Sequence, residues 1–419
     1  MLQSKLGWIE YDVKAREKTM AVLALFQESE GREELGIGVI RDSFSDILFP
    51  GTSTIQTRLR YMLFVPWIYQ SVERQNVKAP KFELKVVERE KELIEALSST
   101  EDHGVFGRTS GQKLKRLPSS VYWSGMQVWG IRGTTYSQGE YHRRIKEIYQ
   151  GQELDSEGGW YTWHPTLPDV PEGFPEGVRM ALTRPEAEFI RDRILENCKG
   201  SFLAYLVANQ ITPPEQCKYP WELAQGVKEN RDLYQLLTHA RFFSQVIYGA
   251  ALLYNLMLAE EKKATNLLNT YLQDFEQWFA SLMDVAEKDE ISEWLAHLST
   301  QGSKNKHSDN MWIVLEAKGY RINPQTKFFV EKWINYIIAA LAVGNPTAAE
   351  LYGNKEARAL IRAREENLKG KVRSRFLNRR ALEQWQGGAG LTRLNYRWAN
   401  VRILLQDLNN GLAAGGGDA

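Results

Sequence analysis

Three residues around position 313 have the types that a metal-dependent nuclease uses. Asp309 is followed, after an apolar run, by Glu316 and Lys318 in the stretch DNMWIVLEAKG. In such nucleases carboxylates bind a divalent ion and a lysine on a neighbouring strand steadies the attacking water. The apolar residues, however, follow the helical period, with Ser308 as an N-cap and Gly319 as a stop. We therefore expect an amphipathic helix, which cannot form a strand-borne site, and keep the nuclease as an alternative.

The remaining candidates for metal or nucleotide chemistry have the wrong spacing. The six histidines never fall at the H-x-x-x-H spacing of a zinc site. Cys198 and Cys217 are too few for a four-ligand site, and we expect two buried thiols. The stretch GVFGRTSGQK resembles a phosphate-binding loop only superficially, because its lysine is not followed by Ser or Thr. The sequence thus predicts no catalytic residue, no metal site and no cofactor.

The stretch RDSFSDILFPGTSTIQTRLRYMLFVPW, residues 41–67, has the pattern of two helices joined by a tight turn. Pro50 and Gly51 stop the first helix, and we expect Gly51 to adopt a positive φ, which glycine tolerates best. Ser53 opens an S-x-x-Q capping box, which predicts a second helix from near Thr54. This layout is that of a helix-turn-helix. The alternative is a helical hairpin that packs within the fold and has no binding role.

The predicted second helix would place hydroxyls and cations where a phosphate can bind. The hydroxyls of Ser53 and Thr54 would lie at its N-terminus, where backbone amides favour anions. Arg58 and Arg60 should project away from its apolar face and be exposed. Pro66 should kink or end the helix, because it lacks the N–H that the helical ladder needs. The two hydroxyls and the two arginines are therefore candidate nucleic-acid contacts.

Lysine and arginine are concentrated in two parts of a chain whose formal net charge is only +1. In the second part, residues 355–402, bases far outnumber acids, and Lys369, Arg373 and Arg380 recur at spacings that allow one helical face. Internal pairing cannot use all these bases, so we expect an anionic partner and, for about six phosphate contacts, a salt slope near −5. The candidate contacts in the first part, residues 104–150, are Lys113, Lys115, Arg116, Arg143 and Arg144.

The elements that carry these residues should be helices almost throughout. The strongest apolar stripe runs over 232–263, and another helix should follow over 266–287. Capping boxes predict further helices after Ser137 and Thr183. The fold class is therefore mostly α, a multi-helix bundle with a helix-turn-helix or winged-helix-like N-terminal part. The expected divisions are a basic helical domain over 1–150, a Gly/Pro-rich acidic linker or loop over 151–180, a helical bundle over 181–345 and a basic helical segment over 346–412.

Length and composition place the chain among folded proteins. At 419 residues and 43% hydrophobic, it can bury a sizeable core. No apolar run reaches the roughly 18 residues of a membrane span, and no secretion signal with a small-residue cleavage site occurs. We expect a cytoplasmic protein with no membrane partner.

The chain resembles a bacterial family described only as a domain of unknown function. The resemblance is carried by ELGIGVIRD, FPGTSTIQTRLRY and FVPW, and extends to LPSSVYWSGMQVWGIRG and LNYRWANVRILLQDL. Members of that family are encoded among antiphage defence genes, often near helicase or nuclease genes. The resemblance therefore implies a genomic context and a helicase or nuclease as a protein partner, and it supplies no catalytic residues.

Three functional classes follow from these observations. The first is a non-catalytic subunit of a defence complex that binds DNA, duplex or single-stranded, or acts as an adaptor; the basic regions and the missing catalytic groups favour it. The second is the metal-dependent nuclease of Asp309, Glu316 and Lys318. The third is a helical scaffold that binds only protein. Salt-dependent DNA binding distinguishes the first from the third.

Overall fold

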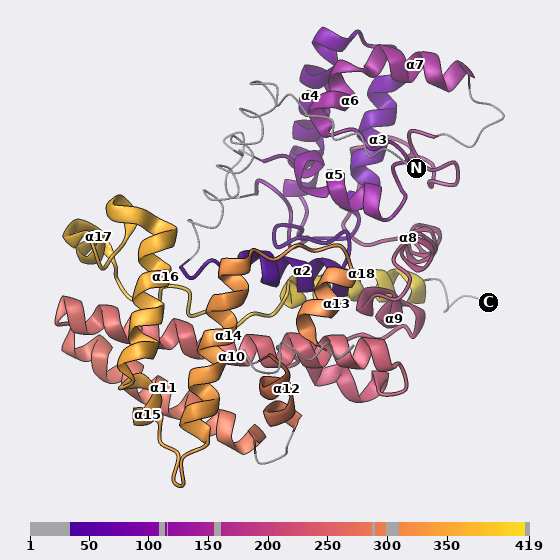
Figure 1. The fold of residues 1–419 in the computed structure, drawn as a ribbon. Coiled ribbons are helices and arrows are strands. Elements are labelled where there is room, and N and C mark those ends of the chain that lie inside the picture. The colour runs from indigo at the N-terminus through magenta and orange to yellow at the C-terminus, as the bar shows by residue number, and fades with distance from the viewer. Residues whose placement is uncertain are drawn as a thin grey trace, which may run out of the picture. The chain divides into compact units, whose positions relative to one another are not determined.

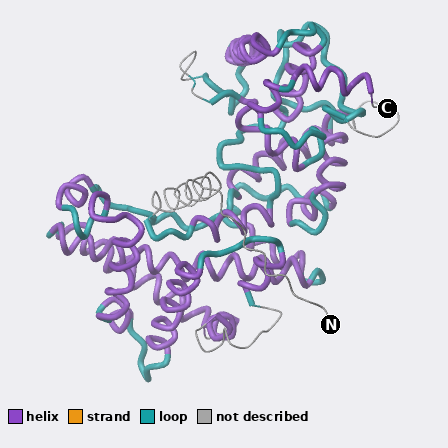
Figure 2. The backbone as a smooth tube through the Cα atoms, turned by 45° about the horizontal axis from the view of Figure 1, so that its top comes forward, coloured by secondary structure: helices purple, strands orange, loops and turns teal. Residues whose placement is uncertain are grey.

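The protein is built from helices joined by turns and loops, as a computed structural model shows (Figure 1). The structure describes residues 34–108, 114, 116–154, 161–286, 290–298 and 310–414. Within these ranges there is no β-strand (Figure 2). One isolated bridge joins Arg132 to Trp163. The expectation of a mostly α, multi-helix fold is confirmed.

The helices fall into two compact units that are each assembled from separate parts of the chain. Among the described residues, the first unit combines residues 34–43 with Gln235–Leu394, and the second combines Phe44–Tyr234 with residues 395–414. The chain passes between them within α2 (Gly38–Leu48) and near the start of α10 (Arg231–Lys262). This division differs from the succession of four segments that the sequence suggested.

The first unit is built around α10, which matches the predicted 232–263 helix. Its apolar side chains pack so completely that 94% of an 18-residue window is buried, although its length and composition alone would allow a membrane span. The indole N–H groups of Trp278 and Trp333 donate to main-chain carbonyls of this helix at 2.8 and 2.9 Å. Gly249 permits the close approach, because a Cβ there would overlap the Trp278 ring. The other helices are α11 (Thr265–Ala286), α12 (Glu290–Leu298), α13 (Met311–Ala317), α14 (Pro324–Leu341), α15 (Ala348–Tyr352), α16 (Lys355–Arg373) and α17 (Arg379–Gln384).

The second unit packs its helices around buried aromatic side chains. Tyr69 lies at the centre, with the rings of Trp123, Tyr141 and Trp163 at centroid distances of 5.1–5.6 Å. The capping boxes predicted after Ser137 and Thr183 both form. Its helices are α3 (Tyr61–Glu73), α4 (Ala79–Ser98), α5 (Pro118–Val128), α6 (Gln138–Arg143), α7 (Ile145–Leu154), α8 (Arg184–Asn197), α9 (Phe202–Ala208), the 3-10 helix η2 (Pro220–Val227) and α18 (Trp398–Ala413).

The helix predicted to start near Thr54 is wrong, because the chain from Phe49 to Arg60 is irregular and α3 begins only at Tyr61. Side chains from elsewhere in the second unit bond the N–H groups that a helix would have used. The hydroxyl of Tyr122 accepts from the N–H groups of residues 57 and 58, and the carboxylate of Asp407 accepts from that of residue 59. These tertiary bonds replace the helical ladder.

The S-x-x-Q pattern forms a turn instead of a helix cap. The side chain of Gln56 accepts from the Ser53 N–H and donates to the Gly51 carbonyl, both at 3.1 Å. Gly51 has the predicted positive φ, +78°, and a Cβ there would overlap the Trp129 indole. Pro66 does not end α3, which continues through it to Glu73 and is buried along most of its length.

Candidate nucleic-acid interface

The two arginines of the opening stretch are engaged inside the second unit, so the expectation that they are exposed is wrong. The guanidinium of Arg60 is buried, pairs with Glu186 at 2.6 Å and donates to the Arg179 carbonyl at 2.7 Å. Arg58 forms an ion pair with Asp407 at 2.9 Å, and that carboxylate is also mostly buried. Both cations therefore hold loops to helices and leave little charge for a phosphate.

The hydroxyls of Ser53 and Thr54 do not lie at a helix N-terminus. Ser53 is half-buried and its backbone N–H is taken by Gln56, whereas Thr54 is exposed in a turn. The phosphate site that depended on aligned helical amides is therefore not formed here.

The predicted contacts between residues 104 and 150 are partly described by the structure. Lys113 and Lys115 lie outside the described residues, and Arg116 is exposed. Arg143 and Arg144 are exposed at the end of α6; the guanidinium of Arg144 lies 5.1 Å from the ring centroid of Tyr136 and 3.5 Å from Glu147. The second unit thus carries a small exposed basic site at the α6–α7 junction.

Most cations in the basic part of the chain over residues 355–402 have partners inside the protein. These partners reduce the charge that is left for an anionic ligand. On α16, Arg358 and Arg362 form ion pairs with Glu260 and Glu261 of α10. The expectation that internal pairing cannot use all of these bases therefore applies only to a minority of them, because most have a partner inside the protein. The other cations of this segment with partners inside the protein are Arg364, Lys369, Arg375, Arg379, Arg397 and Arg402.

Lys369 is buried and does not share an exposed face with Arg373. Its ammonium binds Glu34, and the guanidinium of Arg375 binds the same carboxylate. Burial disfavours the charge of Glu34, but the hydrogen bonds from Arg375 and Lys369 outweigh burial and hold its pKa below the usual value. Arg375 also donates to the hydroxyl of Tyr254 at 2.8 Å. One carboxylate thus fixes the end of α16 to the segment that precedes α2.

The chain reverses between α16 and α17 in a turn, residues 370–380, that we call the basic turn. Gly370 has φ +60°, which interrupts the helix. The hydroxyl of Ser374 donates to the buried carboxylate of Glu365 at 2.5 Å, and the Arg375 N–H donates to the same carboxylate at 2.7 Å. Asn378 caps α17 through its side-chain oxygen and donates from its amide to the Val372 carbonyl at 2.5 Å.

The basic turn presents cations that are not used internally. Lys371, Arg373 and Arg380 are exposed and have no ion-pair partner among the described residues. Arg379 pairs with Glu383 at 3.1 Å, and both of those side chains are largely exposed. A surface of this kind attracts phosphates or carboxylates.

Glu316, one of the candidate nuclease residues, lies on a helix, as the apolar period predicts. α13 is capped by Asn310, whose side-chain oxygen accepts from the Trp312 N–H at 2.8 Å; the predicted cap, Ser308, and the candidate ligand Asp309 lie outside the described residues. Gly319, with φ +89°, ends the helix as predicted. Glu316 forms an ion pair with Lys327, and Lys318 is the C-cap residue.

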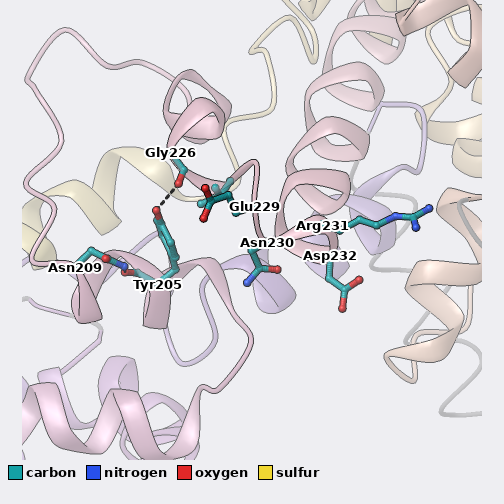
Figure 3. A pocket seen from close by; sticks show the side chains of 8 residues that line it. Tyr205, Asn209, Gly226, Glu229, Asn230, Arg231 and Asp232 are labelled. Atoms are coloured by element: carbon teal, nitrogen blue, oxygen red, sulfur yellow. Dashed lines mark hydrogen bonds between the residues drawn. The ribbon is translucent and has the colours of Figure 1, made fainter.

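A polar depression of about 620 Å³ lies in the second unit (Figure 3). Tyr205 donates across it to the Gly226 carbonyl at 2.6 Å. Its charged lining residues are Glu229, Arg231 and Asp232, so two carboxylates face one cation, which disfavours an anionic ligand. In the described ranges no three His, Cys, Asp or Glu side chains gather as metal ligands. The pocket therefore does not compete with the basic turn as a phosphate site.

The residues that position the basic turn were not found from the sequence. Asn378 precedes a short helical stretch, and this N-cap signal could have indicated a break before α17. Glu34 has no such signal, because its partners lie more than 330 positions away.

The comparisons with known proteins agree with the resemblance and add no activity. No curated protein and no solved structure matches the chain. A family model described as "Family of unknown function (DUF6361)" matches residues 3–411. Because this match covers nearly the whole sequence, the chain belongs to that family.

Proposed function

We propose that the protein is a non-catalytic DNA-binding subunit whose basic turn holds the phosphate backbone. The observation that carries the proposal is the exposure of Lys371, Arg373 and Arg380 on a turn that is held by hydrogen bonds. The Ser374 hydroxyl and the Arg375 N–H bind the buried carboxylate of Glu365, and the Asn378 amide donates to the Val372 carbonyl at the surface. Phosphate contacts by lysine and arginine supply most non-specific DNA affinity. A fixed turn binds with a smaller loss of conformational entropy than a mobile basic segment.

Because the neighbouring arginines are paired inside the protein, only the three exposed cations of the basic turn are counted as phosphate contacts, and this number sets the expected salt dependence of binding. Three free cations correspond to a slope of about −2.7 for log affinity against log salt, smaller than the slope of about −5 for six contacts. Arg143 and Arg144 of the second unit are further candidate phosphate contacts. Their contribution to the salt slope should be smaller, because Arg144 already lies beside Glu147. A defence complex containing a helicase or nuclease remains part of the proposal, on the resemblance alone.

The test reverses two charges of the basic turn and measures binding to duplexes of unrelated sequence over a range of salt. Arg373→Glu with Arg380→Glu should weaken binding equally for all sequences and flatten the slope by about 1.8. Both side chains are exposed, so the thermal unfolding midpoint should be unchanged.

A matched control is Lys355→Glu at the opposite end of α16, which is also exposed and changes the charge by the same amount per residue. It should leave the slope at its parental value. Parental affinity and slope in the Arg373/Arg380 double variant would exclude the basic turn as the contact. Absence of salt-dependent binding by the parent would favour the protein scaffold.

A further inference from the structure

The basic turn exposes apolar side chains between its cations. Val372 is 79% exposed and stands between the exposed Lys371 and Arg373, and Leu377 is 52% exposed five residues later. An apolar side chain this exposed gains nothing from the fold of the chain. Single exposed apolar side chains are common on protein surfaces, and Val372 differs in standing between two exposed cations on a turn that is fixed by hydrogen bonds.

The position of Val372 is fixed although its side chain has little cover. Its carbonyl accepts from the Asn378 amide at 2.5 Å, and two residues later the Ser374 side chain is bonded to Glu365. The Ser374 hydroxyl also accepts from the N–H groups of Phe376 and Leu377, both at 3.2 Å. The side chain therefore projects from a preorganised turn, which lowers the entropy lost on insertion.

We propose that Val372 inserts between stacked bases of duplex DNA, with Lys371 and Arg373 on the flanking phosphates. The inference rests on the proposed function and names its ligand more closely: a duplex that unstacks readily, as at a mismatch. Proteins that kink DNA insert apolar side chains between base steps and hold the adjacent backbone with cations. Charge complementarity favours DNA, because cations occupy both neighbours of the exposed valine.

If Val372 inserts between bases, the protein should prefer a mismatched duplex to a matched one. Phosphate contacts alone would not produce this preference. Separating two stacked base pairs costs a few kcal/mol, and a mismatch has already lost part of that stacking. The parent protein should therefore bind a duplex with a central mismatch about tenfold more tightly than the matched duplex. A 2-aminopurine beside the mismatch should brighten on binding, because it becomes unstacked.

The experiment compares the parent with Val372→Ala on both duplexes at several salt concentrations. Losing two methyl groups from a buried contact should weaken binding to the mismatched duplex by about tenfold. The mismatch preference and the 2-aminopurine signal should disappear, while the salt slope stays the same, because no charge changes. Leu84→Ala is the matched control: Leu84 is 70% exposed on α4 and should affect none of these readouts.

Each other outcome overturns the inference in a recognisable way. If Val372→Ala keeps the preference and the signal, Val372 does not insert, and the charge-reversal experiment still decides the proposed function. If polyglutamate binds the parent with the same dependence on Val372, the turn docks an acidic protein. If the parent shows no salt-dependent DNA binding, the proposed function itself has failed and the inference fails with it.

Discussion

Replacing Glu34 by glutamine should destabilise the first unit, because two cations depend on its carboxylate. The exposed side-chain fractions are 7% for Lys369, 20% for Arg375 and 21% for Glu34, so the cluster is mostly removed from water. Removing one partner of a fully buried pair costs about 3–5 kcal/mol. The remaining solvent access screens the cations, and we expect about 2–3 kcal/mol for Glu34→Gln.

The assay is denaturant unfolding combined with hydrogen exchange of peptides from α16 and α17. Arg375→Met serves as the second arm of a double-mutant cycle: the two changes together should cost less than the sum of the single costs. The pKa of Glu34 is lowered in the folded state, so its contribution is present above the unfolded value of 4.5 and is lost as the pH falls through the folded value. Parental stability and exchange rates for Glu34→Gln at pH 7 would refute the reasoning.

Two further predictions concern the second unit. Gly51→Ala should cost about 2–4 kcal/mol, because it combines left-handed strain with overlap on Trp129, and urea unfolding measures it; a loss below about 1 kcal/mol would contradict the tight turn. Burial raises the pKa of Glu90 to about 7, although Ser119 hydrogen-bonds to the carboxylate. The contribution of the protonated Glu90 carboxyl to stability is therefore fully present below about pH 4.5. It is lost as the pH rises from about 4.5 to about 7. Glu90→Gln should therefore be more stable than the parent at pH 8, by up to about 3 kcal/mol, and similar at pH 4.5; equal pH profiles for the two proteins would exclude the buried carboxyl as their cause.

Helices with strong local signals could be predicted almost to the residue. α10 and α11 begin and end within a residue or two of the predicted 232–263 and 266–287, because a long apolar stripe and polar ends are properties of the segment itself. The same holds for the Gly319 stop, whose left-handed φ only glycine adopts easily. These features need no information from the rest of the chain.

The candidate site could not be predicted in the same way. Whether each of its cations is buried or exposed depends on partners that lie far away in the sequence. Lys369 and Arg373 lie four positions apart and would share a face on a continuous helix, but Gly370 breaks the helix between them. One side chain then meets Glu34 and the other meets solvent. The spacing of the charged residues along the sequence therefore indicates neither the pairing with Glu34 nor the helix break at Gly370.

Glu34 also separates the two ways in which the basic turn can act on DNA. If only net charge mattered, Glu34→Gln would strengthen binding, because it removes an acidic group beside the turn. If the fixed turn matters, the same change should weaken binding, because it loosens Arg375 and the backbone that presents Arg373. The two effects have opposite signs, so one binding curve distinguishes them. We expect weaker binding with an unchanged salt slope, since the exposed cations remain and only their positions become less defined.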